Sequence, residues 1–154
     1  MFMRKKTITL SFWVFTILLI SSGCGKDKDS TPTKTKTELL CSGTWKFDKA
    51  TASGVGDISG QPALACYVDN TMTFSSNLTG TISEGANVCT TPAPANFTWS
   101  FLSSETILRL SFTLFTGGSP DFTIVSLSET SMVLSQTMTI APYPATTIEV
   151  TFKH

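Results

Sequence analysis

The feature that most constrains the fold is a repeated alternation of apolar and polar residues in short segments from residue 43 onward. An apolar side chain at every second position indicates a β-strand with one buried face, because successive side chains of a strand point to opposite sides. Eight segments show this pattern: 43–49, 68–74, 80–84, 96–102, 106–114, 122–127, 132–140 and 148–152. None of the stretches between them has the helical periodicity, over roughly 10–15 residues, that a parallel sheet requires.

Strands that follow one another through turns predict an antiparallel meander, and eight such strands close naturally into a barrel. Closure also removes the exposed edges at which sheets aggregate. A β-sandwich is the alternative, because alternation alone does not distinguish the two folds. The turn at 75–79 is expected to place Asn77 in the left-handed conformation. Residues 50–65 have no periodicity and predict a long loop, of the kind that often forms a lid.

One face of the predicted strands carries large apolar side chains, which would point into a barrel. The candidate ligand-binding residues of this interior are Trp45, Phe47, Met72, Phe74, Trp99, Phe101, Phe112 and Met132. A barrel of eight strands is either filled by its own side chains or holds one small apolar ligand. Both readings stay open at this point, and in the second the loop at 50–65 would cover the opening.

The N-terminal part of the chain divides into two segments that precede the domain. Residues 1–23 carry three basic residues at 4–6, followed by an uncharged, mostly apolar run at 7–20. That run is shorter than the roughly 20 residues of a membrane-spanning helix, and it is typical of a signal peptide. Residues 24–37 are polar and charged, which predicts a disordered tether. The folded domain is expected over residues 38–154.

The sequence Ser21-Ser-Gly-Cys24 resembles the bacterial lipobox, with Ser21 at the position that is usually Leu. The resemblance implies cleavage before Cys24 and acyl chains on that cysteine, which would anchor the protein in a membrane. The Lys and Asp residues that follow resemble an export signal of Gram-negative lipoproteins. The expected location is therefore the bacterial outer membrane, and both the periplasmic and the outward-facing leaflet stay open.

The charge of the predicted domain excludes one class of partner. From residue 38 onward there are four basic and nine acidic residues, which gives a net charge of 4 − 9 = −5. A nucleic-acid surface needs clustered Lys and Arg, so no nucleic-acid partner is expected. Apart from the membrane and a small hydrophobic ligand, the polar loops around Tyr67 and Tyr143 suggest contact with a surface glycan or a partner protein.

The four cysteines are not expected to form two disulfides, because Cys24 is assigned to lipid. Cys66 and Cys89 bracket the hairpin that turns near residue 77, so we predict a disulfide between them in an oxidising compartment. Cys41 is then left as a small, buried apolar residue. A zinc site is disfavoured because the chain has no Cys-x-x-Cys pair and a single, terminal histidine.

The order of several motifs also carries a resemblance. Gly43-Thr-Trp45 is followed by Cys66-x-x-Asp69-Asn70, then by Glu84-Gly85 and Cys89. This order resembles the lipocalin-like domains of Gram-negative surface lipoproteins, over roughly residues 37–154. The resemblance implies a barrel but assigns no ligand.

No residue set in the sequence has the spacing of a catalytic motif. The only histidine, His154, is expected to be frayed, which removes Ser-His-Asp and Cys-His arrangements. The acidic residues that could meet in space are expected at strand ends and turns, as solvated surface: Asp48, Asp69, Glu84, Glu105 and Asp121. We therefore expect a protein that is not an enzyme and that needs no cofactor or metal.

Overall fold

The computed structural model describes residues 33–154, so the predicted signal peptide, Cys24 and most of the predicted tether lie outside the described residues. The strands are β1 (Thr44–Ala52), β2 (Gly56–Asp57), β3 (Thr71–Phe74), β4 (Thr79–Ser83), β5 (Asn96–Leu102), β6 (Ile107–Leu110), β7 (Asp121–Leu127), β8 (Ser131–Met138) and β9 (Thr146–Lys153). The helices are α1 (Lys36–Leu40) and the 3-10 helix η1 (Pro62–Tyr67). Within residues 33–154, neither helix has the length and apolarity needed to cross a membrane.

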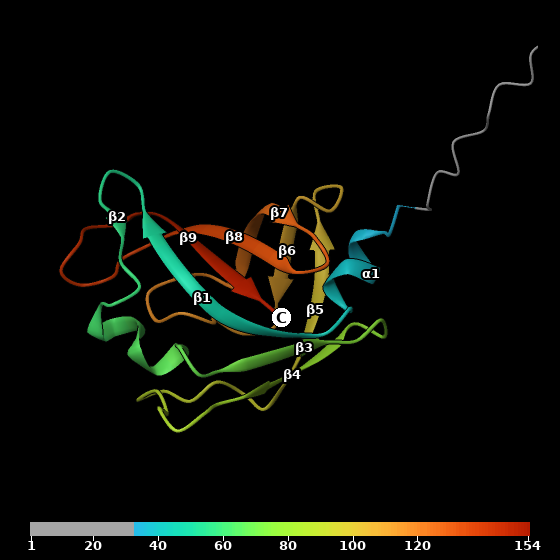
Figure 1. The fold of residues 1–154 in the computed structure, drawn as a ribbon, viewed down its shortest axis with the longest axis horizontal. Helices are drawn as coiled ribbons and strands as arrows, with labels where there is room; N and C mark the ends of the chain where they lie inside the picture. The colour runs from blue at the N-terminus through green and yellow to red at the C-terminus, as the bar shows by residue number, and fades with distance from the viewer. Residues whose placement is uncertain (1–32) are drawn as a thin grey trace, which may run out of the picture. The chain divides into compact units, whose positions relative to one another are not determined.

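The strands form one antiparallel sheet that closes in a ring. From β3 to β9 each strand pairs with the next, and β1 pairs with β3 along one edge and with β9 along the other. Figure 1 shows β1 curving across the molecule between these two partners. The predicted eight-stranded meander barrel is confirmed, and a single closed sheet excludes the sandwich. The ninth strand, β2, lies outside the ring and pairs only with the last residues of β1.

The segment expected to be one loop at 50–65 is more ordered than predicted. β1 continues to Ala52, and the chain then reverses into β2 and enters η1 at Pro62. Because η1 occupies the residues before the second predicted strand, β3 begins at Thr71 rather than at 68. Val68 follows η1 and is 43% exposed, so its predicted inward position is wrong.

Three other expectations needed correction. The predicted strand at 106–114 ends at Leu110, and the later apolar residues of that segment pack on the core from a loop. In the β3–β4 turn the left-handed residue is Leu78, with a φ of 67°, and not Asn77. Helix α1 begins at Lys36, two residues before the expected start of the domain. Its N-cap is Thr35, which forms a capping box with Glu38.

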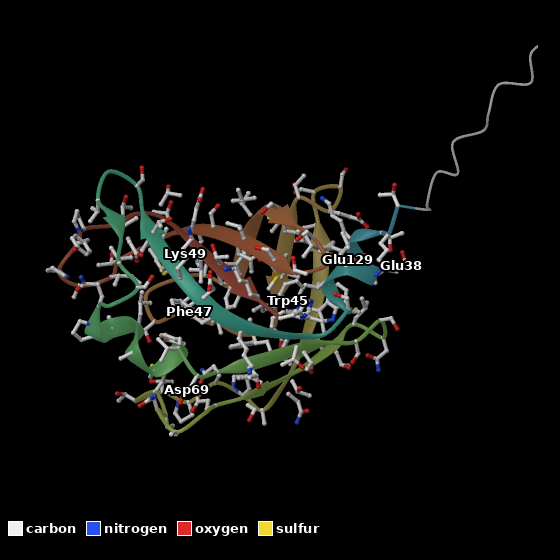
Figure 2. All side chains as sticks on the ribbon, in the orientation of Figure 1. Glu38, Trp45, Phe47, Lys49, Asp69 and Glu129 are labelled. Atoms are coloured by element: carbon white, nitrogen blue, oxygen red, sulfur yellow. A yellow bond between two sulfur atoms is a disulfide. The ribbon has the colours of Figure 1, made fainter. Side chains whose placement is uncertain are left out.

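The two ends of the ring differ. At the end beside α1, the connections at 75–78, 103–106 and 128–130 are short, and Trp45 donates from Nε1 to the Leu40 carbonyl at 2.8 Å. At the opposite end, which we call the mouth, the connections at 53–70, 84–95, 111–120 and 139–145 are longer and cover the opening. Figure 2 shows Trp45 near α1 and Asp69 beside η1, at opposite ends of the sheet.

Candidate functional site

The candidate residues of the barrel interior are mostly buried. Trp45, Met72, Phe74, Trp99 and Met132 are each at most 4% exposed. Phe47, Phe101 and Phe112 are half-buried and pack against the same core. Seven of the eight side chains come from strands of the ring, whereas Phe112 lies in the β6–β7 connection.

These side chains largely fill the interior. A cavity toward the mouth, which we call the inner cavity, has a volume of about 10 Å³, and Met72 is the one candidate residue among those that line it: Tyr67, Asn70, Met72, Ile82, Leu114, Phe115 and Phe152. A water molecule needs roughly this much space, whereas pockets for drug-sized ligands measure about 300–1,000 Å³. The interior as it stands therefore accommodates a single atom-sized group rather than a whole ligand.

Hollows of about 500 and 440 Å³ lie beside strands β4, β5 and β6. Two others lie at the mouth. One of these two, of about 610 Å³, lies between η1 and the β4–β5 connection. The second, of about 330 Å³, lies between the β4–β5 and β6–β7 connections. Tyr67, Thr91 and Thr116 line both, so the two hollows adjoin. We call them together the mouth groove. Its combined size is that of a small-molecule site, and its walls are alanine, proline, threonine and aromatic side chains.

Two walls of the mouth groove are fastened to each other. Cys66 in η1 and Cys89 in the β4–β5 connection form a disulfide, with Cα atoms 5.0 Å apart, which confirms the predicted pairing. Asp69 Oδ2 accepts hydrogen bonds from the backbone N–H and the side-chain amide of Asn87, each at 3.1 Å. The two cysteines are 23 residues apart in the sequence, and a disulfide that closes a loop of this length stabilises the fold by about 3 kcal/mol. The walls formed by η1 and the β4–β5 connection should therefore be rigid.

Further bonds complete this fastening, which we call the wall clamp. Asn70 Oδ1 accepts from the Gly85 N–H at 3.4 Å, and Glu84 Oε1 accepts from the Ala93 N–H at 2.8 Å. A side chain at Gly85 would collide with Asp69, because a Cβ there would approach its carboxyl group to 2.3 Å. The expected solvated role of Asp69 and Glu84 is therefore wrong: both carboxylates hold backbone N–H groups of the β4–β5 connection.

The third wall, the β6–β7 connection, is attached by packing and by hydrogen bonds near its two ends, between Ser111 and Thr98 and between Ser119 and Gln136. Phe115 is 1% exposed and meets Tyr67 edge to face, with ring centroids 4.8 Å apart. The backbone N–H of Thr116 donates to the Tyr67 hydroxyl at 3.3 Å, a long hydrogen bond. Tyr67 and Leu114 line both the mouth groove and the inner cavity. These side chains therefore separate the two spaces.

The mouth groove carries no charged side chain among its lining residues. The carboxyl groups with shifted pKa values lie elsewhere. Hydrogen bonds from Arg109 hold the pKa of Asp121 below its ordinary value, and those from Ser59 do the same for Asp57. The capping box lowers the pKa of Glu38, and Lys34 lowers that of Glu129. A neutral, partly apolar groove suits an uncharged ligand.

The remaining candidate groups are dispersed or structural. His154 is not frayed: its ring packs on Trp45 at a centroid distance of 4.0 Å, and its Nδ1 lies 3.1 Å from the Thr44 carbonyl oxygen. Its Nε2 is 3.1 Å from the Ser42 hydroxyl, on exposed surface. Cys41 has a free, half-buried thiol, and burial raises the pKa of that thiol. Within residues 33–154 no three metal-ligating side chains cluster.

Several residues of the site were not among the predicted ones. Asn70, Leu114 and Phe115 line the inner cavity, and Tyr67 was predicted only as a loop contact. The motif Cys66-x-x-Asp69-Asn70 was the available signal for the wall clamp, because its polar residues directly follow a cysteine. No periodicity marks Phe115, which reaches the core from an irregular segment.

A closed antiparallel ring with one loop-covered mouth defines a class of small barrels that carry their sites at the opening or inside. Residues 42–134 match the model of the lipocalin-like domain, which is more than half of the chain, and the chain belongs to this family. A search of curated proteins found no match. The predicted family resemblance is thereby confirmed for the domain.

Proposed function

We propose that this protein is a lipid-anchored bacterial envelope lipoprotein whose lipocalin-like domain binds a small apolar ligand at the mouth of the barrel. The observation that carries the ligand-binding part is the mouth groove, a neutral hollow with two walls joined by a disulfide and a third wall held by packing and hydrogen bonds. Because the interior is filled, the proposed site lies at the opening of the barrel and not along its axis, where the sequence had suggested it. Catalysis has no role in this proposal.

Ligand binding is tested by purifying the protein from its native membrane under mild conditions and identifying bound small molecules by mass spectrometry. We expect one class of apolar compound at a fixed ratio to protein. A variant that fills the groove, Thr91→Trp, should lose this compound, whereas Thr137→Trp on the exposed face of β8 serves as the matched control. Repeated recovery of the unmodified protein without any bound compound would contradict the proposal.

Anchoring rests on the lipobox resemblance of Ser21-Ser-Gly-Cys24, which lies outside the described residues. Growth with an alkyne-tagged palmitate should label the wild-type protein and leave Cys24→Ala unlabelled. Cys41→Ala is the matched control, because Cys41 is the free cysteine of the described domain and should not carry lipid. Fractionation and surface proteolysis of the labelled protein then distinguish the outer membrane from the inner one, and the outward from the periplasmic leaflet.

The second candidate is a surface protein with a packed barrel that contacts a glycan or a partner protein and binds no small ligand. The inner cavity of about 10 Å³ favours it, because a filled barrel needs no ligand. Glycan arrays and crosslinking on intact cells would detect such partners. If a glycan or protein partner is found and Thr91→Trp does not change the small molecules recovered with the protein, this second candidate replaces the first.

A further inference from the structure

A buried amide lies behind the mouth groove without a partner. Asn70 directly precedes β3 and is 8% exposed. Its Oδ1 accepts the Gly85 N–H, which fixes the orientation of the amide, and its Nδ2 has no acceptor within residues 33–154. An unpaired buried donor costs about 1–3 kcal/mol, so native proteins seldom retain one without a purpose.

The position of this donor connects it to the groove. Asn70 lines the inner cavity, and only the side chains of Tyr67 and Leu114 are shared between this cavity and the mouth groove. The volume of about 10 Å³ admits one oxygen-sized atom. A ligand lying in the groove could therefore reach Asn70 with a single projecting atom, provided that Tyr67 turns aside.

The charges around the two spaces indicate what kind of ligand atom would enter the inner cavity. No Lys or Arg lines the inner cavity or the mouth groove. The acidic residues nearest in the fold, Asp69 and Glu84, belong to the wall clamp. A carboxylate entering here would lose its water without meeting a cation, which is costly. A neutral carbonyl oxygen accepts one hydrogen bond from an amide and carries no such penalty.

We propose that Asn70 is the specificity-determining residue of the site and donates from Nδ2 to the carbonyl oxygen of a neutral, apolar ketone, ester or amide. This inference rests on the proposed binding function and specifies its ligand class. The carbonyl oxygen occupies the inner cavity, and the apolar body of the ligand lies in the mouth groove. For this oxygen to pass, the Tyr67 side chain has to rotate on the η1 backbone and release the hydrogen bond that its hydroxyl accepts from the Thr116 N–H at 3.3 Å.

The test compares two neutral fluorescent probes that differ in a carbonyl group. Prodan is a naphthalene with a ketone, and phenylnaphthylamine has no carbonyl. Residues 24–154 carrying Cys24→Ser, which cannot be acylated, are titrated with each probe, and cis-parinaric acid adds a carboxylate. We expect prodan to bind most tightly. Asn70→Asp keeps an oxygen for the Gly85 N–H but removes the donor, and Asn70→Leu removes both.

Both variants should weaken prodan binding by about tenfold and change phenylnaphthylamine binding by less than about twofold. Gln136→Glu is the matched control, because Gln136 is also 8% exposed with an unpartnered Nε2 and lines neither space, and this substitution keeps the Oε1 that accepts from the Ser119 N–H. Circular dichroism of each variant confirms folding. If both probes bind and Asn70 variants leave their affinity ratio unchanged, the role of Asn70 is refuted while the binding function stands. If no probe binds the wild-type protein, both proposals fail.

Discussion

Leu78 adopts a left-handed conformation in the turn between β3 and β4, with a φ of 67°. Residues with a Cβ pay about 1 kcal/mol for this conformation, whereas Asn adopts it more readily. The Leu78 side chain is 48% exposed, so little packing would be lost on replacement. Leu78→Asn should raise the free energy of unfolding by about 0.5–1 kcal/mol in urea titrations. Leu78→Val, which is β-branched, should lower it; equal effects of the two would contradict the strain argument.

Tyr67 offers a second prediction at the same scale. Its hydroxyl accepts from the Thr116 N–H, and its ring packs on Phe115. Tyr67→Phe keeps the ring contact and removes the acceptor. We expect faster hydrogen exchange at the Thr116 amide and a loss of stability of about 1 kcal/mol or less. Exchange at Asn87, which belongs to the wall clamp, is the internal control and should not change.

For single residues, the sequence predicted which side chains are buried better than it predicted whether they lie on a strand. Alternation correctly placed Trp45 and Met72 in the core, because both lie on regular strands of the ring. It failed for Val68, where η1 interrupts the strand, and it could not reveal that Phe112 packs from a loop. Period-two patterns identify residues that face a core, but an irregular segment can present the same pattern without pairing.

The wall clamp combines elements that are distant in sequence. Its disulfide joins η1 to the β4–β5 connection, and the hydrogen bonds of Asp69 and Asn70 join the residues after η1 to the same connection. Asp69→Ala removes the acceptor of two bonds from Asn87 and should lower the free energy of unfolding by about 1–2 kcal/mol. Denaturant titration measures this loss, and Asp48→Ala, whose partner is the exposed Lys153, should cost less than about 1 kcal/mol. A larger effect at Asp48 would contradict the clamp.

The motif that carried the family resemblance acquires a physical explanation through this clamp. Cys66, Asp69 and Asn70 each hold a different group of the β4–β5 connection. The sequence predicted the disulfide because the two cysteines bracket a hairpin. It could not predict the carboxylate contacts, because the β4–β5 connection has no periodicity that would fix its path.

The stability of the whole domain should depend on pH through its shifted carboxyl groups. The folded-state pKa values of Glu38, Asp57, Asp121 and Glu129 are all lowered. A lowered folded-state pKa means that the stabilisation is present above the unfolded-state value and is lost as pH falls through the folded-state value. We therefore expect the free energy of unfolding to decline below about pH 4.5. Asp121→Asn should flatten this decline, and added salt should do so in the wild-type protein, because these groups are exposed.

At the level of the whole molecule, the closed meander was predictable because each strand of the ring has its own alternating pattern and consecutive strands pair with each other. The additional strand β2 was not predictable, since its two residues are too few to show alternation. The sequence left open whether the interior is filled, because the side-chain volumes alone do not tell how closely those side chains pack inside the barrel. The mouth groove is lined by three connections, at 53–70, 84–95 and 111–120, and had no signal of its own beyond the long segment at 50–65.

The pairing of β1 with β9 sets the order in which this domain can be completed. Lys46 opposes Lys153, so the ring closes only when β9, the last strand of the domain, is available. Until then β1 and β8 each present a free edge that can pair with another chain. A polypeptide emerging from a ribosome is therefore open to aggregation until β9 has been made, and a break within β9 exposes two edges at once.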